Sequence, residues 1–365
     1  MLKRLKRWSF WTVAAVLAFV ASALVSTLIE FDDSPAPAMI AATAEPAAVP
    51  ASVRATYVVA DRHGFVPVGA GLVRYAVWNP RAVPARGSVL VLQGRGEFIE
   101  KYATEIVPEL LARGFAVYAL DWHGQGLSER LLADRQKGHV DGYDTYQADL
   151  RAVLTSVVAP EAPRPLIALT HSMGGHNLLR HFAEAGADSP VSAALMVAPM
   201  TALRKQAIAA VMISLFPDTE AINGRFFYGS RPFRLIGREF VGNKVTHDER
   251  RFRFSEAWYG ADSRLALGGP TIGWMRETLR SLRKLHQPGY LERIVQPVRI
   301  LSAGQDLLID GSSHREICAR LARCTVVDYP DARHEIMMEI DTIRARFLAD
   351  FDRFAEIHAP APKSN

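Results

Sequence analysis

The stretch "ALTHSMGGHNLLR" at residues 168–180 decides the fold of this chain. It begins as an apolar strand, passes through a polar His-Ser pair and continues as an amphipathic helix after two glycines. A serine hydroxyl is a weak nucleophile at neutral pH and needs a base to take its proton and fixed donors to hold the developing oxyanion. A sharp strand-to-helix turn meets both needs, because it exposes the serine oxygen and directs the first N–H groups of the helix toward a reacting carbonyl. We therefore predict Ser172 as a nucleophile and the N–H of Met173 as one oxyanion donor.

The residues after this turn supply the partners of a catalytic triad. At the turn itself, Thr170 replaces the first glycine of the usual G-x-S-x-G pattern, so the motif alone also fits a serine in an ordinary loop. In this architecture an acid and then a histidine follow the serine, each just beyond a strand. Asp306 follows "VRILSAG" and His334 follows "CTVVDYP". We predict His334 as the general base and Asp306 as the carboxylate that fixes its tautomer. Asp310 is a rival acid, although it lies where the next helix should begin.

A glycine-rich turn, "VLQGRGEFIEKY" at residues 91–102, stands where the second oxyanion donor should come from. We predict the N–H of Arg95 as that donor. Gly94 and Gly96 let the backbone approach a substrate, although a plain tight turn would use the same residues. The stretch lacks the ending of a phosphate-binding loop and the third glycine of a dinucleotide motif, and no His/Glu pair in the chain has zinc-protease spacing. We expect no cofactor and no metal.

Short apolar runs alternate with helical patterns along most of the chain, which predicts an α/β fold with a mostly parallel central sheet flanked by helices. Residues 56–80 are typical of an antiparallel hairpin at one edge. The expected strands cover residues 88–93, 115–121, 165–170, 191–199, 298–304 and 324–330. The expected helices lie near residues 98–113, 143–158, 174–186, 312–322 and 338–357.

The alternation stops between residues 200 and 297, which we interpret as a helical cap inserted into a core of residues 56–199 and 298–358. This insertion carries 16 Lys/Arg, 9 Asp/Glu and 12 aromatic residues. An acyl chain needs an apolar pocket, and an anionic head group or lipid surface favours basic side chains nearby. The charges and rings also fit a solvated face over a small core of the cap itself. Four arginines carry the lipid-binding hypothesis: Arg234, Arg238, Arg251 and Arg253.

The N-terminus is predicted to enter a membrane. Residues 1–30 begin with a basic cluster and continue with 22 uncharged, mostly apolar residues, Trp8–Ile29. The run is long enough to cross a bilayer, yet Ala21-Ser22-Ala23 offers a cleavage site. We expect a signal-anchor helix, with a cleaved signal peptide as the alternative. The positive-inside rule then predicts an inner-membrane-anchored protein whose catalytic domain is periplasmic or otherwise extracytoplasmic, or an exported one if cleavage occurs.

An Ala/Pro-rich linker at residues 31–55 is expected to join this segment to the folded body. Two cysteines, Cys318 and Cys324, are too few for a disulfide scaffold. Export permits one bridge between them, and we favour two independent core residues. The formal net charge of +5 falls to +2 without the first thirty residues, and no basic helix accompanies it, so we expect no nucleic-acid partner.

Four segments together resemble the bacterial lysophospholipase and monoacylglycerol lipase branch of the α/β-hydrolases: "QGRGEFIEKY", "DWHGQGLSERLLADRQKGHVDGYDTYQADL", "THSMGGH" and the tail with Asp306 and His334. The resemblance spans residues 56–354, and "HGQGLSERLLADRQKGHV" is its most specific part. It implies hydrolysis of a single acyl ester without a cofactor. Carried over by position, it gives Ser172, Asp306 and His334 as the triad and Arg95 and Met173 as the oxyanion pair.

We therefore expect a serine hydrolase that cleaves a carboxylic ester of a lysophospholipid or monoacylglycerol through an acyl-enzyme intermediate. Two alternatives remain open. The first is an aminopeptidase-like amide hydrolase of the same fold, which would need acidic groups that hold a substrate amine. The second is a binding module that keeps the fold without turnover, for which the only sign is Thr170.

Overall fold

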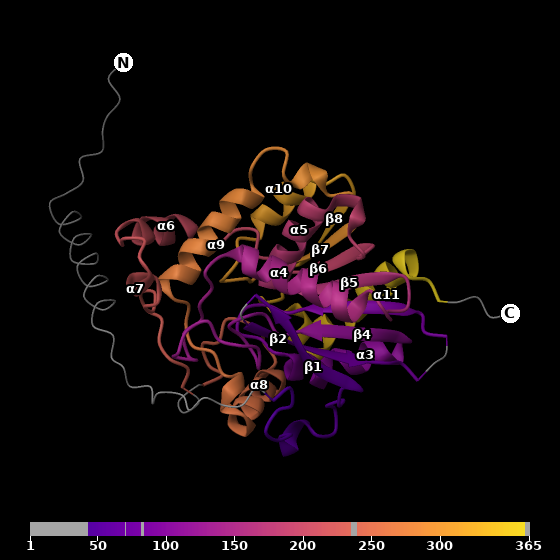
Figure 1. The fold of residues 1–365 in the computed structure, drawn as a ribbon. Helices are drawn as coiled ribbons and strands as arrows, with labels where there is room; N and C mark the ends of the chain where they lie inside the picture. The colour runs from indigo at the N-terminus through magenta and orange to yellow at the C-terminus, as the bar shows by residue number, and fades with distance from the viewer. Residues whose placement is uncertain (1–42, 70, 82–83, 235–238, 362–365) are drawn as a thin grey trace.

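The computed structural model describes residues 43–69, 71–81, 84–234 and 239–361 (Figure 1). Its centre is an eight-stranded sheet in the order β1-β2-β4-β3-β5-β6-β7-β8. β1 and β2 form an antiparallel hairpin, β2 is antiparallel to β4, and all other pairs are parallel. The predicted sheet with an antiparallel edge is thus confirmed. The strands are β1 Arg62–Val68, β2 Gly71–Trp78, β3 Gly87–Leu92, β4 Phe115–Leu120, β5 Leu166–His171, β6 Ala193–Val197, β7 Val298–Ala303 and β8 Cys324–Tyr329.

Helices cover both faces of the sheet because its central strands are apolar on both sides. Along β3, Leu90 and Leu92 face one hydrophobic cluster, and Val89 and Val91 face another. The first cluster is closed by α4 Tyr143–Val153, its π-helical continuation Leu154–Val158, α5 Met173–Ala185 and α10 Ser312–Arg320. The second is closed by α2 Ile99–Glu105, α3 Val107–Ala112 and α11 Asp341–His358. This layering places the carboxyl ends of β3, β5, β7 and β8 along one edge.

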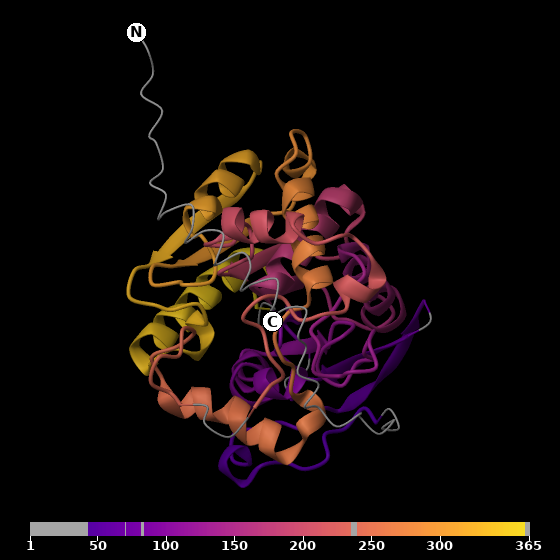
Figure 2. The same ribbon diagram turned by 90° about the vertical axis from the view of Figure 1, so that its left-hand side faces the viewer.

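In its described part, residues 200–234 and 239–297, the cap consists of helices joined by loops and contributes no strand to the sheet. Its helices are α6 Gln206–Ser214, α7 Glu220–Asn223, α8 Glu249–Ala261 and α9 Ile272–Leu285. α8 and α9 begin at side-chain caps, since Asp248 accepts from the Arg251 N–H and Thr271 from the Trp274 N–H. α6, α7 and α9 lie together, whereas α8 lies at the lower end of both views beside the start of the described chain (Figures 1 and 2). Short 3-10 turns complete the fold at Ala51–Val53, Gly186–Asp188, Ser263–Leu265, Leu291–Arg293 and Ile336–Met338.

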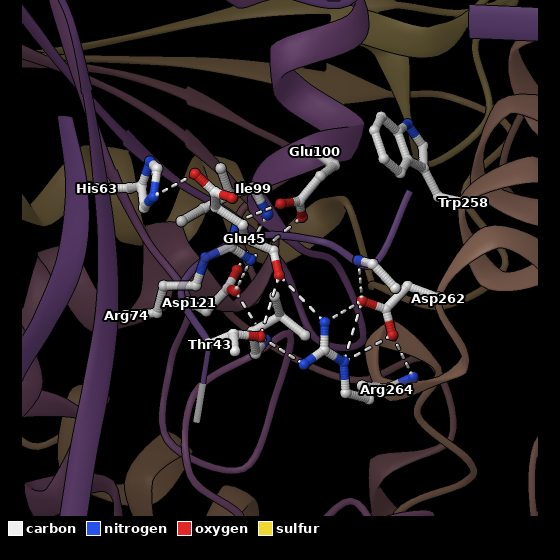
Figure 3. A network of polar contacts seen from close by, with 12 residues as sticks. Thr43, Glu45, His63, Arg74, Ile99, Glu100, Asp121, Trp258, Asp262 and Arg264 are labelled. Carbon is white, nitrogen blue, oxygen red and sulfur yellow. Dashed lines mark hydrogen bonds and ion pairs between the residues drawn. The ribbon is translucent and has the colours of Figure 1, made fainter. Parts of the chain in front are cut away.

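The last part of the expected linker packs on the body. The Ala47 N–H donates to Asp262 Oδ2 at 2.8 Å, and Arg264 donates to Thr43 Oγ1 at 2.6 Å and to the Glu45 carbonyl at 3.1 Å. Figure 3 shows these contacts beside Arg74, which is buried between Glu100 and Asp121. Further on, Val53 is fully buried against Phe98 and Trp258. The chain before the hairpin is therefore fastened to the cap and to the helix layer beneath it.

Cys318 and Cys324 form a disulfide, so our preference for two independent cysteines was wrong. The end of α10 and the start of β8 bring the two Cα atoms to 5.2 Å, within the range that a bridge requires. The short turn between helix and strand creates this approach, and six residues of spacing alone do not reveal it.

The predicted membrane segment, residues 1–30, lies outside the described residues. Within the described ranges, none of the helices combines the length and apolar character that a membrane crossing requires.

Candidate active site

Ser172 occupies a strained turn between β5 and α5. Its φ of 48° and ψ of −115° lie in a region that residues with a side chain rarely adopt. Hydrogen bonds hold the strain in place: the Ser172 N–H donates to the Val197 carbonyl at 3.0 Å, and the Ser172 carbonyl accepts from the Met200 N–H at 2.9 Å. The strand-to-helix corner predicted from the sequence is therefore present, and it is fixed by the neighbouring β6 and the loop that follows it.

Two glycines let α5 begin directly against the sheet. A Cβ on Gly174 would lie 2.1 Å from the Leu92 carbonyl oxygen at the end of β3. A Cβ on Gly175 would lie 2.7 Å from the Pro199 Cβ and 3.0 Å from Thr170 Oγ1. Thr170 is fully buried and is accommodated because Gly175 has no side chain. The departure from G-x-S-x-G therefore leaves the turn intact.

Asp306 and His334 form a buried hydrogen-bonded pair across the loops after β7 and β8. The Asp306 Oδ2 atom lies 2.6 Å from His334 Nδ1, and Oδ1 accepts from the N–H groups of Leu308 at 2.8 Å and Ile309 at 2.9 Å. Burial raises the pKa of the Asp306 carboxyl, but the hydrogen bond and charge of His334 and the two N–H groups outweigh it and hold that pKa below its usual range. An ionised carboxylate at Nδ1 leaves Nε2 as the proton acceptor. The rival Asp310 instead accepts from Ser312 at the start of α10.

Ser172 lies beside this pair through its neighbour in the chain. His171 Nε2 lies 3.3 Å from the His334 carbonyl oxygen, and the two imidazole rings have centroids 4.7 Å apart. Within the described residues no hydrogen bond joins the Ser172 hydroxyl to His334. Such bonds are often long in enzymes without substrate and shorten when the substrate binds. The structure thus joins Asp306 to His334 and brings the serine turn against them.

The predicted oxyanion loop lies against the serine. A Cβ on Gly94 would lie 3.1 Å from the Ser172 Cβ. The Gly94 N–H donates to Glu97 Oε2 and the Gly96 N–H to Gln125 Oε1, each at 2.5 Å. Among the described residues, the N–H groups of Arg95 and Met173 have no such partner. Both N–H groups therefore have no acceptor within the described chain, and their role as oxyanion donors stays a prediction.

Glu97 and His171 form a second acid–histidine pair, which the sequence analysis did not identify. His171 Nδ1 lies 2.8 Å from Glu97 Oε2, while its Nε2 faces the His334 carbonyl. Both ring nitrogens therefore face acceptors, which requires a proton on each. Burial lowers the pKa of His171, but the charge and hydrogen bond of Glu97 outweigh it and raise that pKa above its usual value. We assign His171 as an imidazolium. The only sign in the sequence was the position of Glu97, an acidic residue between a glycine-rich turn and the apolar start of a helix.

The Glu97 carboxylate links the oxyanion loop, the turn after β5 and, through Lys101, the loop that carries His334. Besides His171, it accepts from the Gly94 N–H, from Tyr102 at 2.8 Å and from Lys101 at 2.7 Å. Lys101 also pairs with Glu335 at 2.7 Å, in the loop that carries the predicted base. Burial raises the pKa of Glu97, but His171 and Lys101 hold it well below its usual range. One buried charge thus fixes the oxyanion loop and, through its two cations, reaches the loop of His334.

The basic and aromatic cap is only partly available to a lipid. Arg251 is buried in ion pairs with Glu105, Asp248 and Asp341, so it cannot serve the lipid-binding role that we expected of it. Arg253 pairs with Glu249 and Glu256, and Arg238 lies outside the described residues. Phe254 and Trp258 pack inward in a cluster with Val53, Phe98 and Leu127 of the body, rather than in a core of the cap alone. Other cap residues face a cavity of about 410 Å³ beside the oxyanion loop, lined by Arg95, Arg231, Phe233, Arg234, Phe252 and Tyr259 among others.

A mostly parallel sheet, a strained serine at a strand-to-helix turn and an acid–histidine pair on later loops define a serine hydrolase of the α/β-hydrolase fold. Residues 83–341 match Hydrolase_4, the serine aminopeptidase S33 family. The chain belongs to this family and to its lysophospholipase and monoacylglycerol lipase branch, and it is a carboxylic ester hydrolase.

Two curated lysophospholipases and two solved structures are similar to this chain. Lysophospholipase L2 of Escherichia coli K12 is 31% identical over 288 residues, which cover 75% of this chain and 82% of the relative. The probable lysophospholipase L2 of Haemophilus influenzae is 26% identical over 277 residues, which cover 75% and 85%. A soluble variant of the Saccharomyces cerevisiae monoglyceride lipase has the same fold at a TM-score of 0.65 and 19% identity, covering 83% of this chain and 97% of that one. A thermostable Bacillus coagulans carboxyl esterase also gives a TM-score of 0.65, at 18% identity, with 83% and 100% covered.

Proposed function

We propose that this chain cleaves the acyl ester of a lysophospholipid or monoacylglycerol, with Ser172, His334 and Asp306 as its catalytic triad. The observation that carries the proposal is the buried Asp306–His334 hydrogen bond beside the strained Ser172 turn. The proposal gives these three groups, which follow strands at one edge of the sheet, the roles that their chemistry allows.

In this mechanism His334 Nε2 takes the Ser172 proton as the serine oxygen attacks the ester carbonyl carbon. The N–H groups of Arg95 and Met173 stabilise the negative carbonyl oxygen. As the tetrahedral intermediate collapses, the bond to the glycerol oxygen breaks and His334 gives its proton to that leaving alcohol. Water then attacks the acyl-enzyme by the same route, which releases the fatty acid and regenerates the serine. Asp306 steadies the imidazolium in both halves.

The substrate class is supported by the lining of the cavity and by the relatives. Phe233, Phe252 and Tyr259 offer apolar surface, while Arg95 and Arg231 offer positive charge. A pocket with both characters suits a lipid with a polar head. An aminopeptidase would need a free carboxylate for the substrate amine. Glu97 and Glu335 line the same cavity, but both are paired with buried cations.

We propose an extracytoplasmic location for the folded domain. The basic cluster and apolar run of residues 1–30 support an anchor or export signal. The Cys318–Cys324 disulfide adds support, because such bridges persist in oxidising compartments and are rare in the cytosol. Labelling of an added surface cysteine in intact spheroplasts with a membrane-impermeant maleimide tests this, and labelling that requires lysis would contradict it.

Reaction with a fluorophosphonate probe tests the catalytic assignment directly. Wild type should label, and Ser172→Ala should not while keeping its circular dichroism spectrum. Ser192→Ala is the matched control, since that serine is exposed at the start of β6. Turnover of lysophosphatidylethanolamine, monoacylglycerol, p-nitrophenyl butyrate and an aminoacyl anilide then ranks the substrates. Folded wild type that fails to label would overturn the proposed function, and a preference for the anilide would favour the amide alternative.

A further inference from the structure

The side chain of Arg95 carries a charge that no carboxylate in the described structure neutralises. Its Nη2 donates to the Gly268 carbonyl at 2.9 Å, and the guanidinium lies 5.0 Å from the centre of the Trp274 ring. Its Nε is buried without a hydrogen-bond partner. Burial lowers the pKa of Arg95 to about 10, which still leaves the group charged at neutral pH. A buried cation without an anion is costly, so this position suits an arginine whose partner arrives with a ligand.

Three glycines shape the wall that holds this guanidinium. A Cβ on Gly138 would lie 1.9 Å from Arg95 Nη2. Gly268 and Gly269 close the other side, and a Cβ on either would meet the chain at 2.6 Å or less, at the Gln136 carbonyl and at Ser230. The two walls are joined by hydrogen bonds, from the Gly138 N–H to the Gly269 carbonyl at 3.1 Å and from the Gly268 N–H to the Gln136 carbonyl at 2.9 Å. The site that holds the Arg95 side chain is therefore formed in part by "RQKGHV", which belongs to the segment that carries the most specific part of the family resemblance.

The cavity beyond the guanidinium is positive. Arg231 and Arg234 line it together with Arg95. The acids on its wall are Glu97 and Glu335, and both are occupied: Glu97 by His171 and Lys101, and Glu335 by Lys101. Arg95 and Arg231 thus add positive charge to the cavity that these two acids, each already paired with a cation, do not neutralise. An anion that enters it would meet Arg95, whose backbone belongs to the oxyanion loop beside Ser172.

We propose that the Arg95 guanidinium, with Arg231, binds the phosphate of a glycerophospholipid substrate and so selects lysophospholipids over neutral monoacylglycerols. The inference rests on the proposed function and deepens it. Arg95 is suited to both tasks because its N–H is the proposed oxyanion donor and its residue lines the cavity, with its guanidinium beside Gly138. In a lysophospholipid the ester and the phosphate are joined through the short glycerol backbone, a reach comparable to that between the amide and the guanidinium of one arginine.

A comparison of two substrates with the same acyl chain tests this selectivity. For wild type, kcat/KM should be higher for lysophosphatidylglycerol than for monoacylglycerol. Arg95→Met should lower this ratio by about 10- to 100-fold, the size expected for one charge-assisted contact of roughly 1.5–3 kcal/mol. Arg95→Lys should restore part of the ratio. Arg283→Met, at an exposed arginine of α9 away from the cavity, is the matched control and should leave the ratio as in wild type. Equal losses on both substrates in Arg95→Met would overturn the proposal.

Binding to Ser172→Ala supplies a readout without turnover. Calorimetry should show that an ether analogue of the lysophospholipid binds at least ten times more tightly than the ether analogue of the monoacylglycerol, and that Arg95→Met removes the difference. Inorganic phosphate should bind far more weakly than the phospholipid analogue. Equal binding of the two ether lipids, or tight binding of phosphate alone, would overturn the proposal. Failure of the proposed function has a different signature, since wild type would then hydrolyse neither lipid and would not react with fluorophosphonate.

Discussion

The imidazole of His171 lies against the imidazole of His334, with the ring centroids 4.7 Å apart. Each ring has its own buried carboxylate, Glu97 at 2.8 Å and Asp306 at 2.6 Å. The two acid–histidine pairs differ in purpose. Asp306 leaves one nitrogen of His334 free to accept a proton, whereas Glu97 and the His334 carbonyl occupy both nitrogens of His171. We expect the second pair, an ion pair whose nitrogens and carboxylate are all engaged, to position the first.

Asp306→Asn should lower kcat by about 10⁴-fold while the protein remains folded, because an amide favours the wrong tautomer of His334. Steady-state kinetics on p-nitrophenyl butyrate measure the change. Asp310→Asn, four residues away in the same loop, is the control and should retain activity near that of wild type. A reversal of these two results would give the acid role to Asp310.

Glu97→Gln should destabilise the protein by about 3–5 kcal/mol, because it leaves the buried cations His171 and Lys101 without their shared carboxylate. Urea unfolding followed by circular dichroism measures the free energy of unfolding. The matched control is Glu161→Gln, which removes an exposed pair with Arg62 and should cost less than about 1 kcal/mol. Similar losses in the two variants would mean that the Glu97 network adds no more than a surface contact.

The raised pKa of His171 predicts that stability falls on the alkaline side. The folded protein binds this proton more tightly than the unfolded chain does, so the stabilisation is complete below the ordinary value of 6.5 and is lost as the pH rises through the folded pKa. The slope should be about 1.4 kcal/mol per pH unit at most. Urea midpoints between pH 6 and 10 should show this slope in wild type and lack it in His171→Gln. A slope that persists in the variant would assign the effect to another group.

Gly174→Ala should damage the fold, because its Cβ would lie 2.1 Å from the Leu92 carbonyl oxygen and neither backbone segment can move freely. We expect a loss of about 1–3 kcal/mol and a larger loss of fluorophosphonate labelling. Gly224→Ala is the control, since its Cβ would have no neighbour nearer than 3.5 Å. Equal melting temperatures in the two variants would show that α5 can retreat from the sheet.

The features that could be predicted from the sequence are those that depend on local residue patterns or on the order of residues along the chain. Strand and helix alternation, the order of Ser172, Asp306 and His334, and the glycine-rich turn at Arg95 each depend on neighbouring residues or on chain order. The pairing of Glu97 with His171 was missed because these residues are 74 positions apart, and only packing brings them together. The bridge between Cys318 and Cys324 was missed although the two residues are only six positions apart, because the turn between α10 and β8 is what brings them together.

Charge counting was least informative in the cap. Arg251 and Arg253 look alike in "RRFRF", but the first points into ion pairs with the core and the second stays on the exposed face of α8. The composition gives the number of arginines, but whether an arginine side chain points toward the core or toward solvent depends on how the helix is oriented. Arg95 shows the converse, since a single arginine in a glycine-rich turn lines a cavity.

The contact between Thr170 and Gly175 bears on how enzymes of this kind are found. The threonine side chain at position 170, two residues before the nucleophile, is accommodated because Gly175, three residues after the nucleophile, has no side chain. A sequence search that insists on a glycine at the earlier place would pass over such a chain. A search that requires a small residue at either of the two facing positions, 170 or 175, would retain it. Exchanging the two residues, so that glycine stands at 170 and threonine at 175, would convert this arrangement into the usual one.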